Sequence, residues 1–170
     1  GYVSVYGQDS CTICPAGTYE INNNKQCESC EAGKYSSDTA QISINTCKDC
    51  PAGKYSSSLA ANDESLCNAC PPGKNSSVSP ATSSSACESC KLDYYQDLEG
   101  QETCKQCLAG FTTKAEGKSV CLACDAGTYM KTESGGSKVC DACPDGYVSV
   151  YGQDSCTICP AGTYEINNNK

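Results

Sequence analysis

A Cys-x-x-Cys pair recurs nine times along this chain, and this repetition constrains the fold more than any other feature of the sequence. The pairs begin at residues 11, 27, 47, 67, 87, 104, 121, 140 and 156, so one module is about 18 residues long. The stretch from Cys11 to Tyr19 reads Cys-Thr-Ile-Cys-Pro-Ala-Gly-Thr-Tyr, and it returns letter for letter from Cys156 to Tyr164. Self-similarity at a short period is typical of solenoids and of arrays of small units.

The composition leaves the cysteines as the main source of stability. The 170 residues include 18 Cys but no Trp, one Phe and one Met, which is too little large apolar surface for an ordinary core. Such modules need disulfides, and disulfides persist in oxidising compartments, so we expect a secreted or cell-surface protein. The predicted fold is small, disulfide-rich and mostly irregular or β. It is an elongated, solenoid-like rod of tandem Cys modules with no helical core.

Several functional classes are disfavoured by what the sequence lacks. The net charge is −8 and there is no arginine, so nucleic-acid binding is not expected. The chain has no histidine, the usual base for a serine or cysteine nucleophile, so we do not expect an enzyme. No apolar run approaches the roughly 20 residues of a membrane span. Without an initiator Met or a signal peptide, the chain is expected to be a window from a longer protein.

The sequence also repeats with a second, longer period that spans several modules. Residues 1–25 are identical to residues 146–170, at an offset of 145 residues. We interpret this as a tandem repeat of which 1–13 ends one unit, 14–158 is a whole unit and 159–170 begins the next; an artificial duplication is the alternative. The eight modules of the whole unit are 14–29, 30–49, 50–69, 70–89, 90–106, 107–123, 124–142 and 143–158.

A Gly-containing turn follows the second cysteine of almost every Cys-x-x-Cys motif, as in Pro15-Ala16-Gly17. Proline presets φ for such a turn and glycine accepts a positive φ. An aromatic residue and a polar spacer come next. The fifth module reads Lys91-Leu92-Asp93 and lacks the glycine, so we expect a different local conformation there.

Eighteen cysteines allow too many connectivities for the sequence alone to select one. Pairing within a Cys-x-x-Cys motif would close a tight ring, which is typical of redox-active thiols. Pairing the second cysteine of one motif with the first of the next closes a longer loop and contributes roughly 3 kcal/mol per bridge on the chain-entropy model. Loop geometry and the period therefore favour Cys14–Cys27, Cys30–Cys47, Cys50–Cys67, Cys70–Cys87, Cys90–Cys104, Cys107–Cys121, Cys124–Cys140 and Cys143–Cys156. Cys11 and Cys159 remain unpaired, with partners expected before Gly1 and beyond Lys170.

The motif Cys-Pro-x-Gly-x-Tyr, closed by a cysteine after a short spacer, resembles the cysteine-rich repeats of tumour-necrosis-factor receptors, ephrin receptors and growth-factor receptors. Chained Cys-x-x-Cys-Pro-Ala-Gly-Thr modules with spacers rich in Ser, Thr and Asn are especially similar to the immobilisation-type surface antigens of ciliates. The resemblance covers the whole chain. It implies a bridge from the cysteine before proline to the next cysteine, which agrees with the pairs above.

Metal and redox chemistry are weaker interpretations of the same motifs. Two Cys-x-x-Cys pairs at this spacing also suit a four-cysteine zinc site, although nine motifs leave one over. Thioredoxin-type chemistry would require a βαβ pattern, which is absent. We expect no cofactor. A weak calcium site between Asp93 and Glu102, with Asp97 and Glu99, is a further candidate, although solvated surface charge is the commoner arrangement.

The spacers carry candidate glycosylation sites. Asn75-Ser76-Ser77 is an N-glycosylation acceptor, and Asn45-Thr46-Cys47 and Asn68-Ala69-Cys70 are the rarer Cys variant, disfavoured because those cysteines should be bridged. Candidate O-glycosylation sites in the hydroxyl-rich spacers are Ser36, Ser37, Thr39, Ser56, Ser57, Ser58, Ser79, Thr82, Ser83 and Ser84. A plain soluble linker is the alternative.

These features predict a structural subunit of an extracellular, glycosylated, repetitive filament or surface coat, whose partners are copies of itself along a fibre. The alternative is a receptor-like cysteine-rich ectodomain that binds a protein ligand. A specific binding face has little need of identical 145-residue copies, and it usually presents arginine or tryptophan anchors, which this chain lacks.

Overall fold

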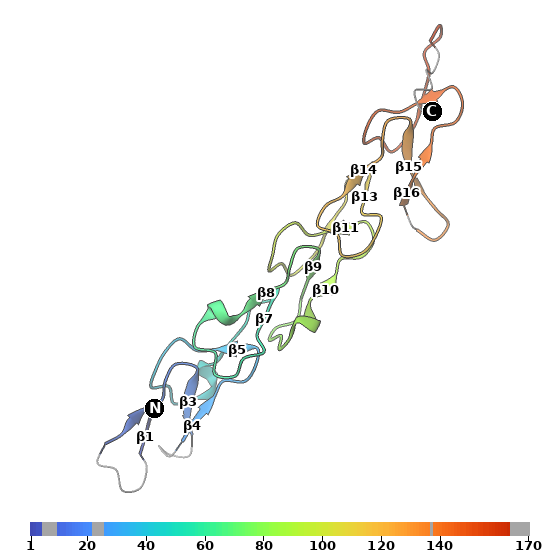
Figure 1. Cartoon of the computed structure of the whole chain (residues 1–170). Coiled ribbons are helices and arrows are strands. Elements are labelled where there is room, and N and C mark those ends of the chain that lie inside the picture. The colour runs from blue at the N-terminus through green and yellow to red at the C-terminus, as the bar shows by residue number, and fades with distance from the viewer. Residues whose placement is uncertain (5–9, 22–25, 137, 164–170) are drawn as a thin grey trace. The chain divides into compact units, whose positions relative to one another are not determined.

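Each module folds into a two-stranded antiparallel hairpin that starts at its turn (Figure 1). The computed structural model describes residues 1–4, 10–21, 26–136 and 138–163. The strand pairs are β1 (Tyr2–Val3) with β2 (Thr12–Ile13), β3 (Thr18–Ile21) with β4 (Gln26–Ser29), β5 (Lys34–Tyr35) with β6 (Lys48–Asp49), β7 (Lys54–Tyr55) with β8 (Asn68–Ala69), β9 (Lys74–Asn75) with β10 (Glu88–Ser89), β11 (Tyr94–Tyr95) with β12 (Lys105–Gln106), β13 (Phe111–Thr112) with β14 (Leu122–Ala123), β15 (Thr128–Thr132) with β16 (Lys138–Ala142), and β17 (Tyr147–Val148) with β18 (Thr157–Ile158). Most of these strands are two residues long, whereas β3 and β4 have four residues and β15 and β16 have five.

Short 3₁₀ turns precede the closing cysteine in modules two, three and four. They are η1 (Ile44–Thr46), η2 (Glu64–Leu66) and η3 (Ser84–Ala86). The side chains of Ser43 and Asp63 accept the backbone N–H of Asn45 and Ser65, and these bonds cap the first two turns. The described residues contain no α-helix, so the prediction of a disulfide-rich, irregular and β array without a helical core is confirmed.

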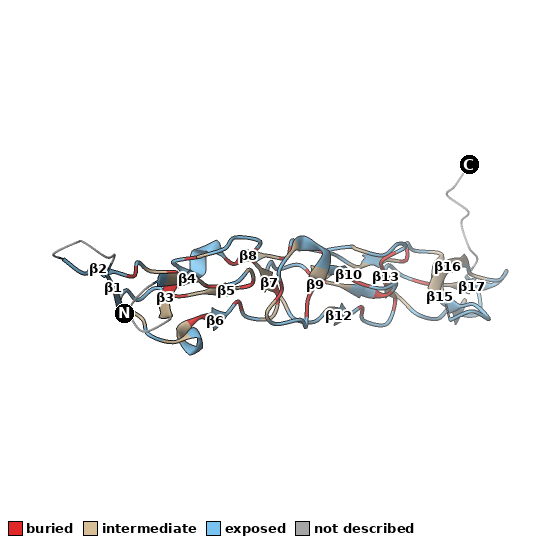
Figure 2. Cartoon of the chain, turned by 90° about the horizontal axis from the view of Figure 1, so that it is seen from below, coloured by how far each residue is buried: buried red, intermediate tan, exposed pale blue. Residues whose placement is uncertain are grey.

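Cysteines take the place of a conventional core. The second cysteines of most motifs are among the most buried residues: Cys14, Cys50, Cys70 and Cys124 are 0% exposed, and Cys30 and Cys90 are 1% exposed. Small residues such as Ala61 and Ala81 accompany them, whereas Leu59 and Leu108 are largely exposed. Figure 2 shows the buried residues as short segments between exposed ones. The modules therefore depend on covalent bridges and backbone bonds more than on apolar burial.

The chain divides into two compact units, whose segments alternate along the sequence in modules four and five. The first comprises Gly1–Pro71, Asn75–Glu88 and Leu98–Thr103, and the second comprises Pro72–Lys74, Ser89–Asp97 and Cys104–Lys170. Each predicted module range between residues 14 and 158 holds one strand pair and one disulfide.

Candidate functional site

The structure joins the cysteines in the eight pairs that the loop geometry favoured. Each bridge links the second cysteine of one motif to the first of the next, across 13 to 17 residues, with Cα atoms 5.4 to 5.8 Å apart. Cys11 and Cys159 carry free thiols. Every other cysteine is in a bridge, and this connectivity makes each module a separately closed loop.

In modules one to four and in module seven, the turn binds the backbone of the module that follows it. In the first module the N–H of Gly17 donates to the carbonyl of Ser36, with 2.7 Å between nitrogen and oxygen. The corresponding bonds are Gly33 to Ser56 (2.8 Å), Gly53 to Ser76 (2.7 Å), Gly73 to Gln96 (2.7 Å) and Gly127 to Ser149 (3.0 Å). Because only backbone atoms take part, these contacts tolerate any spacer sequence that keeps the chain path.

A second set of bonds runs in the opposite direction, from the spacer of one module to the buried cysteine before it. The N–H of Ala60 donates to the carbonyl of Cys30 at 2.9 Å. The same bond joins Ala40 to Cys14 (2.8 Å), Gly100 to Cys70 (2.9 Å), Gly117 to Cys90 (2.8 Å) and Gly152 to Cys124 (2.9 Å). In module four the donor position is Pro80, which has no N–H. The hydroxyl of Ser79 donates to the carbonyl of Cys50 instead, at 2.8 Å.

The serine that accepts the turn N–H is buried, which corrects part of the O-glycosylation prediction. Ser36 and Ser56 are 2% and 0% exposed, so their hydroxyls are not available to a glycosyltransferase once the chain has folded. Among the other predicted acceptors, those that are exposed are Ser37, Thr39, Ser57, Ser58, Ser79, Thr82 and Ser84, and Ser83 is half-buried. Sugar attachment at these residues stays a prediction.

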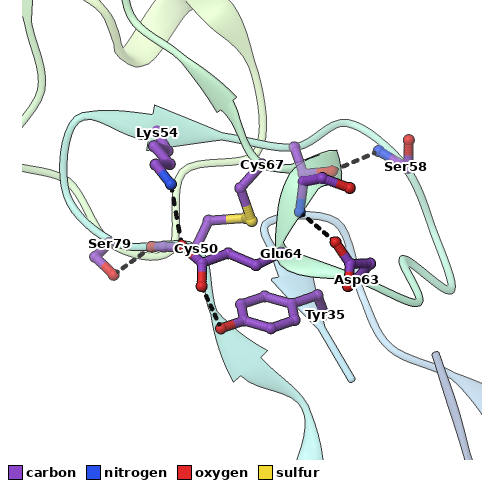
Figure 3. Close-up of a disulfide and its surroundings, with 10 residues drawn as sticks. Tyr35, Cys50, Lys54, Ser58, Asp63, Glu64, Cys67 and Ser79 are labelled. Atoms are coloured by element: carbon purple, nitrogen blue, oxygen red, sulfur yellow. Dashed lines mark hydrogen bonds and ion pairs between the residues drawn. A yellow bond between two sulfur atoms is a disulfide. The ribbon is translucent and has the colours of Figure 1, made fainter. Parts of the chain in front are cut away.

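A side-chain contact joins modules two and three beside the Cys50–Cys67 bridge. Figure 3 shows the carboxylate of Glu64 between the ammonium group of Lys54, 3.0 Å away, and the hydroxyl of Tyr35, 3.3 Å away. The hydrogen bond from Lys54, its charge and the tyrosine hydroxyl lower the pKa of Glu64. Partial desolvation and the nearby carboxylate raise the pKa of Tyr35. All these groups are near the surface, so the contact adds specificity more than stability.

The turn of module five keeps the conformation of the others although it lacks glycine, so the predicted difference is wrong. Asp93 has a φ of 65°, and its carbonyl accepts the N–H of Cys107 at 2.8 Å, as the Gly17 carbonyl accepts that of Cys30. Aspartate tolerates the left-handed region because its short polar side chain forms local hydrogen bonds. The Asp93 carboxylate accepts the hydroxyl of Thr112 at 2.8 Å.

A cavity of about 300 Å³ opens beside Asp93. The Lys138 ammonium group is 4.0 Å from the Asp93 carboxylate, and the N–H of Asp93 donates to the Thr113 hydroxyl at 2.9 Å. Lys114 and Val139 also line this cavity. The cavity therefore offers one carboxylate and two ammonium groups, a set that suits a small polar ligand better than a metal ion.

The residues of the candidate calcium site are not brought together. Asp93 binds Thr112, whereas the Asp97 carboxylate forms an ion pair with Lys105 at 2.6 Å, and the hydrogen bond from Lys105 lowers the pKa of Asp97. In the part of the chain that the structure describes, no three acidic, cysteine or histidine side chains form a metal-binding group. The sequence suggested this site only because the acidic residues are close together along the chain.

A shallow apolar groove of about 210 Å³ lies in the second unit, and the sequence analysis did not anticipate it. It is lined by Tyr95, Leu108, Phe111, Val120 and Cys121. Leu108 and Val120 are 76% and 58% exposed, so the rim of this groove presents apolar surface to solvent. Exposed apolar surface of this kind is a common feature of protein contacts.

Asn75 lies at the end of β9, and the sequence analysis singled it out as an N-glycosylation acceptor. Its side-chain nitrogen donates to the carbonyl of Glu102 at 2.9 Å, and the residue is half-buried. The cysteines of the two rarer acceptor sequences, Cys47 and Cys70, are both in disulfides.

Comparison with known proteins agrees with the repeat architecture. Among the described residues, no helix has the length and apolar character needed to cross a membrane. No curated protein matches the chain. The chain does match the family described as tyrosine-protein kinase ephrin type A/B receptor-like, over residues 17–67 and 77–120. These ranges cover more than half of the sequence, and with its tandem disulfide modules the chain belongs to this family of cysteine-rich repeats, which are of the receptor-ectodomain type.

Proposed function

We propose that this chain is a structural segment of an extracellular repetitive filament or surface coat, built from tandem 145-residue units. The single observation that carries the proposal is the exact identity of residues 1–25 and 146–170. A surface that binds one ligand has no need of such identity. A fibre does need identical units, because equal units joined in the same way repeat the same contacts along its length.

The local structure of the two identical segments supports this proposal. In the first copy β1 pairs with β2 so that Tyr2 lies opposite Ile13, and in the second β17 pairs with β18 so that Tyr147 lies opposite Ile158. The bond that follows is also repeated: the Cys14 N–H donates to the Gly1 carbonyl at 3.0 Å, as Cys159 does to Gly146 at 2.9 Å. The unit 14–158 therefore ends with the same hairpin as the unit before it.

The contacts between modules also suit an array of indefinite length. In modules one to five and seven the turn donates to the following module and the buried cysteine carbonyl accepts from it, with backbone atoms in most cases. Spacers can then vary in sequence and length without loss of the repeating bonds. Disulfides in every module are compatible with an extracellular location, where they persist.

The alternative function is a receptor-like ectodomain that binds a protein ligand, and the apolar groove is the observation that favours it. Leu108 and Val120 are exposed at its rim, next to the rings of Tyr95 and Phe111. Apolar and aromatic surface of this kind is what a partner protein would cover.

The test is to secrete the disulfide-bonded chain and to measure its assembly by analytical ultracentrifugation and electron microscopy over a range of concentrations. A variant with Cys11→Ser and Cys159→Ser is the control against association through the free thiols. We expect both proteins to associate into filaments as the concentration rises. A protein that stays monomeric at every concentration, and that binds a cell-surface protein saturably, would overturn the filament proposal in favour of the receptor-like one.

A further inference from the structure

Module four lacks the aromatic residue that every other module carries directly after its turn. β5 and β7 end in Tyr35 and Tyr55, whereas β9 ends in Asn75. The three strands have the same length, start with lysine and are half-buried at both positions. Asn75 therefore occupies the position at which modules one, two, three, five and seven carry a tyrosine. Modules six and eight carry Thr112 and Val148 at this position, and their ring lies one residue earlier.

Side chains at this position reach the spacer of the following module. The hydroxyl of Tyr35 donates to Glu64, 29 residues further along the chain, and the Asn75 amide donates to the carbonyl of Glu102, 27 residues further along. In module two the ring of Tyr35 therefore lies between its own strand and that spacer. An asparagine side chain, which has no ring, covers less of it.

The residues after Asn75 complete an acceptor sequence for an N-linked glycan. Ser76 is 2% exposed and holds the module in place, while the hydroxyl-bearing Ser77, which the acceptor sequence requires, is exposed. Attachment of the sugar replaces one of the two N–H bonds of the Asn75 side-chain amide. The other N–H remains, so a glycosylated Asn75 can still donate to Glu102.

We infer that Asn75 carries an N-linked glycan, and that its first sugar takes the place of the missing tyrosine ring between modules four and five. A pyranose ring is similar in size to a phenol ring and has an apolar face, so it can cover the surface that Asn75 leaves open. The inference rests on the extracellular location in the proposed function, because N-glycans are added in the secretory pathway. It does not depend on filament assembly.

The first part of the test is the mass of the tryptic peptide 75–91 from protein secreted by a eukaryotic host, after reduction of the disulfides. Trypsin cuts after Lys74 and Lys91, so this peptide contains Asn75 and no other asparagine. We expect a glycan that peptide-N-glycosidase removes with conversion of Asn75 to aspartate. Asn75→Gln should lose this glycan, and Asn45→Gln should not change the mass of the attached sugar. An unmodified Asn75 in the secreted protein would overturn the inference and leave the filament proposal intact.

The second part tests whether the sugar replaces the ring. We expect the secreted Asn75→Gln variant to unfold at a temperature about 2–4 °C below the glycosylated protein, the shift typical of one modest contact in a chain of this length. Asn75→Tyr has no sugar but restores the repeat residue, so its unfolding temperature should return toward that of the glycosylated protein. If Asn75→Gln and the glycosylated protein unfold at the same temperature, or if Asn75→Tyr is the least stable of the three, the sugar does not replace the ring.

Discussion

Replacing Gly53 by alanine should damage the array more than the same change at Gly127, although both glycines occupy the same position of the turn. Their φ angles are almost equal, 82° and 80°. They differ in their surroundings. A Cβ at Gly53 would overlap the carbonyl of Gly100 and lie 2.8 Å from the backbone nitrogen of Gln101, whereas no described atom lies within 4 Å of a Cβ at Gly127. The pair therefore separates backbone strain from close approach of the chain.

The expected magnitudes follow from these two contributions. A left-handed φ costs an alanine about 1–2 kcal/mol, and the stiffer unfolded chain returns about 0.4–1 kcal/mol, so Gly127→Ala should cost about 1 kcal/mol. Gly53→Ala has the same two contributions, which cancel in the comparison. Its Cβ must also displace backbone that is held by hydrogen bonds, and overpacking of this kind costs about 1–3 kcal/mol. The difference between the variants is therefore expected to be about 1–3 kcal/mol.

Native-state amide hydrogen exchange measures this difference locally, with the disulfides intact. The reporters are the amides of Cys70 and Cys143, which donate to the carbonyls of Gly53 and Gly127 at 2.8 and 2.9 Å. The loss of protection at Cys70 in Gly53→Ala should exceed that at Cys143 in Gly127→Ala by about 5- to 150-fold. Equal losses at the two amides would refute the close-approach argument and leave only backbone strain.

Three further changes test the contacts between modules. Asp93→Ala should be less stable than Asp93→Gly by about 1 kcal/mol in thermal unfolding, because both remove the acceptor of the Thr112 hydroxyl but only glycine accepts a φ of 65° without strain, and the stiffer unfolded chain of the alanine variant offsets part of that strain; equal stabilities would contradict this. The hydrogen bond from Lys54 lowers the pKa of Glu64, so the stabilisation by this contact is present above the unfolded-state pKa and is lost as pH falls through the lower folded-state pKa. Nuclear magnetic resonance should show a depressed titration midpoint for Glu64, and Glu64→Gln should lack this part of the acid dependence; an ordinary midpoint would count against the contact. Ser79→Ala should cost about 1 kcal/mol of local stability in hydrogen exchange, because the cysteine carbonyl that its hydroxyl reaches loses its donor; unchanged protection would show that water replaces it.

Much of this fold could be predicted because the covalent bridges dominate it. A spacing of 13 to 17 residues between the second cysteine of one motif and the first of the next permits an unstrained loop, and the same pairing recurs in all eight modules. The hairpins follow, since a turn that ends in Gly17 and a cysteine that closes the loop at Cys27 leave room only for two short strands between them. The glycosylation acceptors were also visible in the sequence, but their burial was not. Ser36 and Ser37 look alike in the sequence. They differ in the structure, where the carbonyl of Ser36 accepts the N–H of Gly17 and Ser36 is buried.

Most contacts between modules could not be predicted, because backbone atoms make them and backbone hydrogen bonds place few constraints on residue type. The sequence signals that exist are indirect. Pro80 has no backbone N–H to donate, and the hydroxyl of Ser79 donates to the Cys50 carbonyl in its place. The Ser79-Pro80 sequence indicates this contact only once the bond to the Cys50 carbonyl is known. The missing glycine at Asp93 misled us for the same reason. We expected a changed turn, whereas what the position requires is a residue that tolerates a positive φ. Aspartate meets that requirement and adds a carboxylate, so the module whose turn lacks glycine keeps its bond to Cys107 and gains a second one, from the Thr112 hydroxyl to the Asp93 carboxylate at the edge of the cavity.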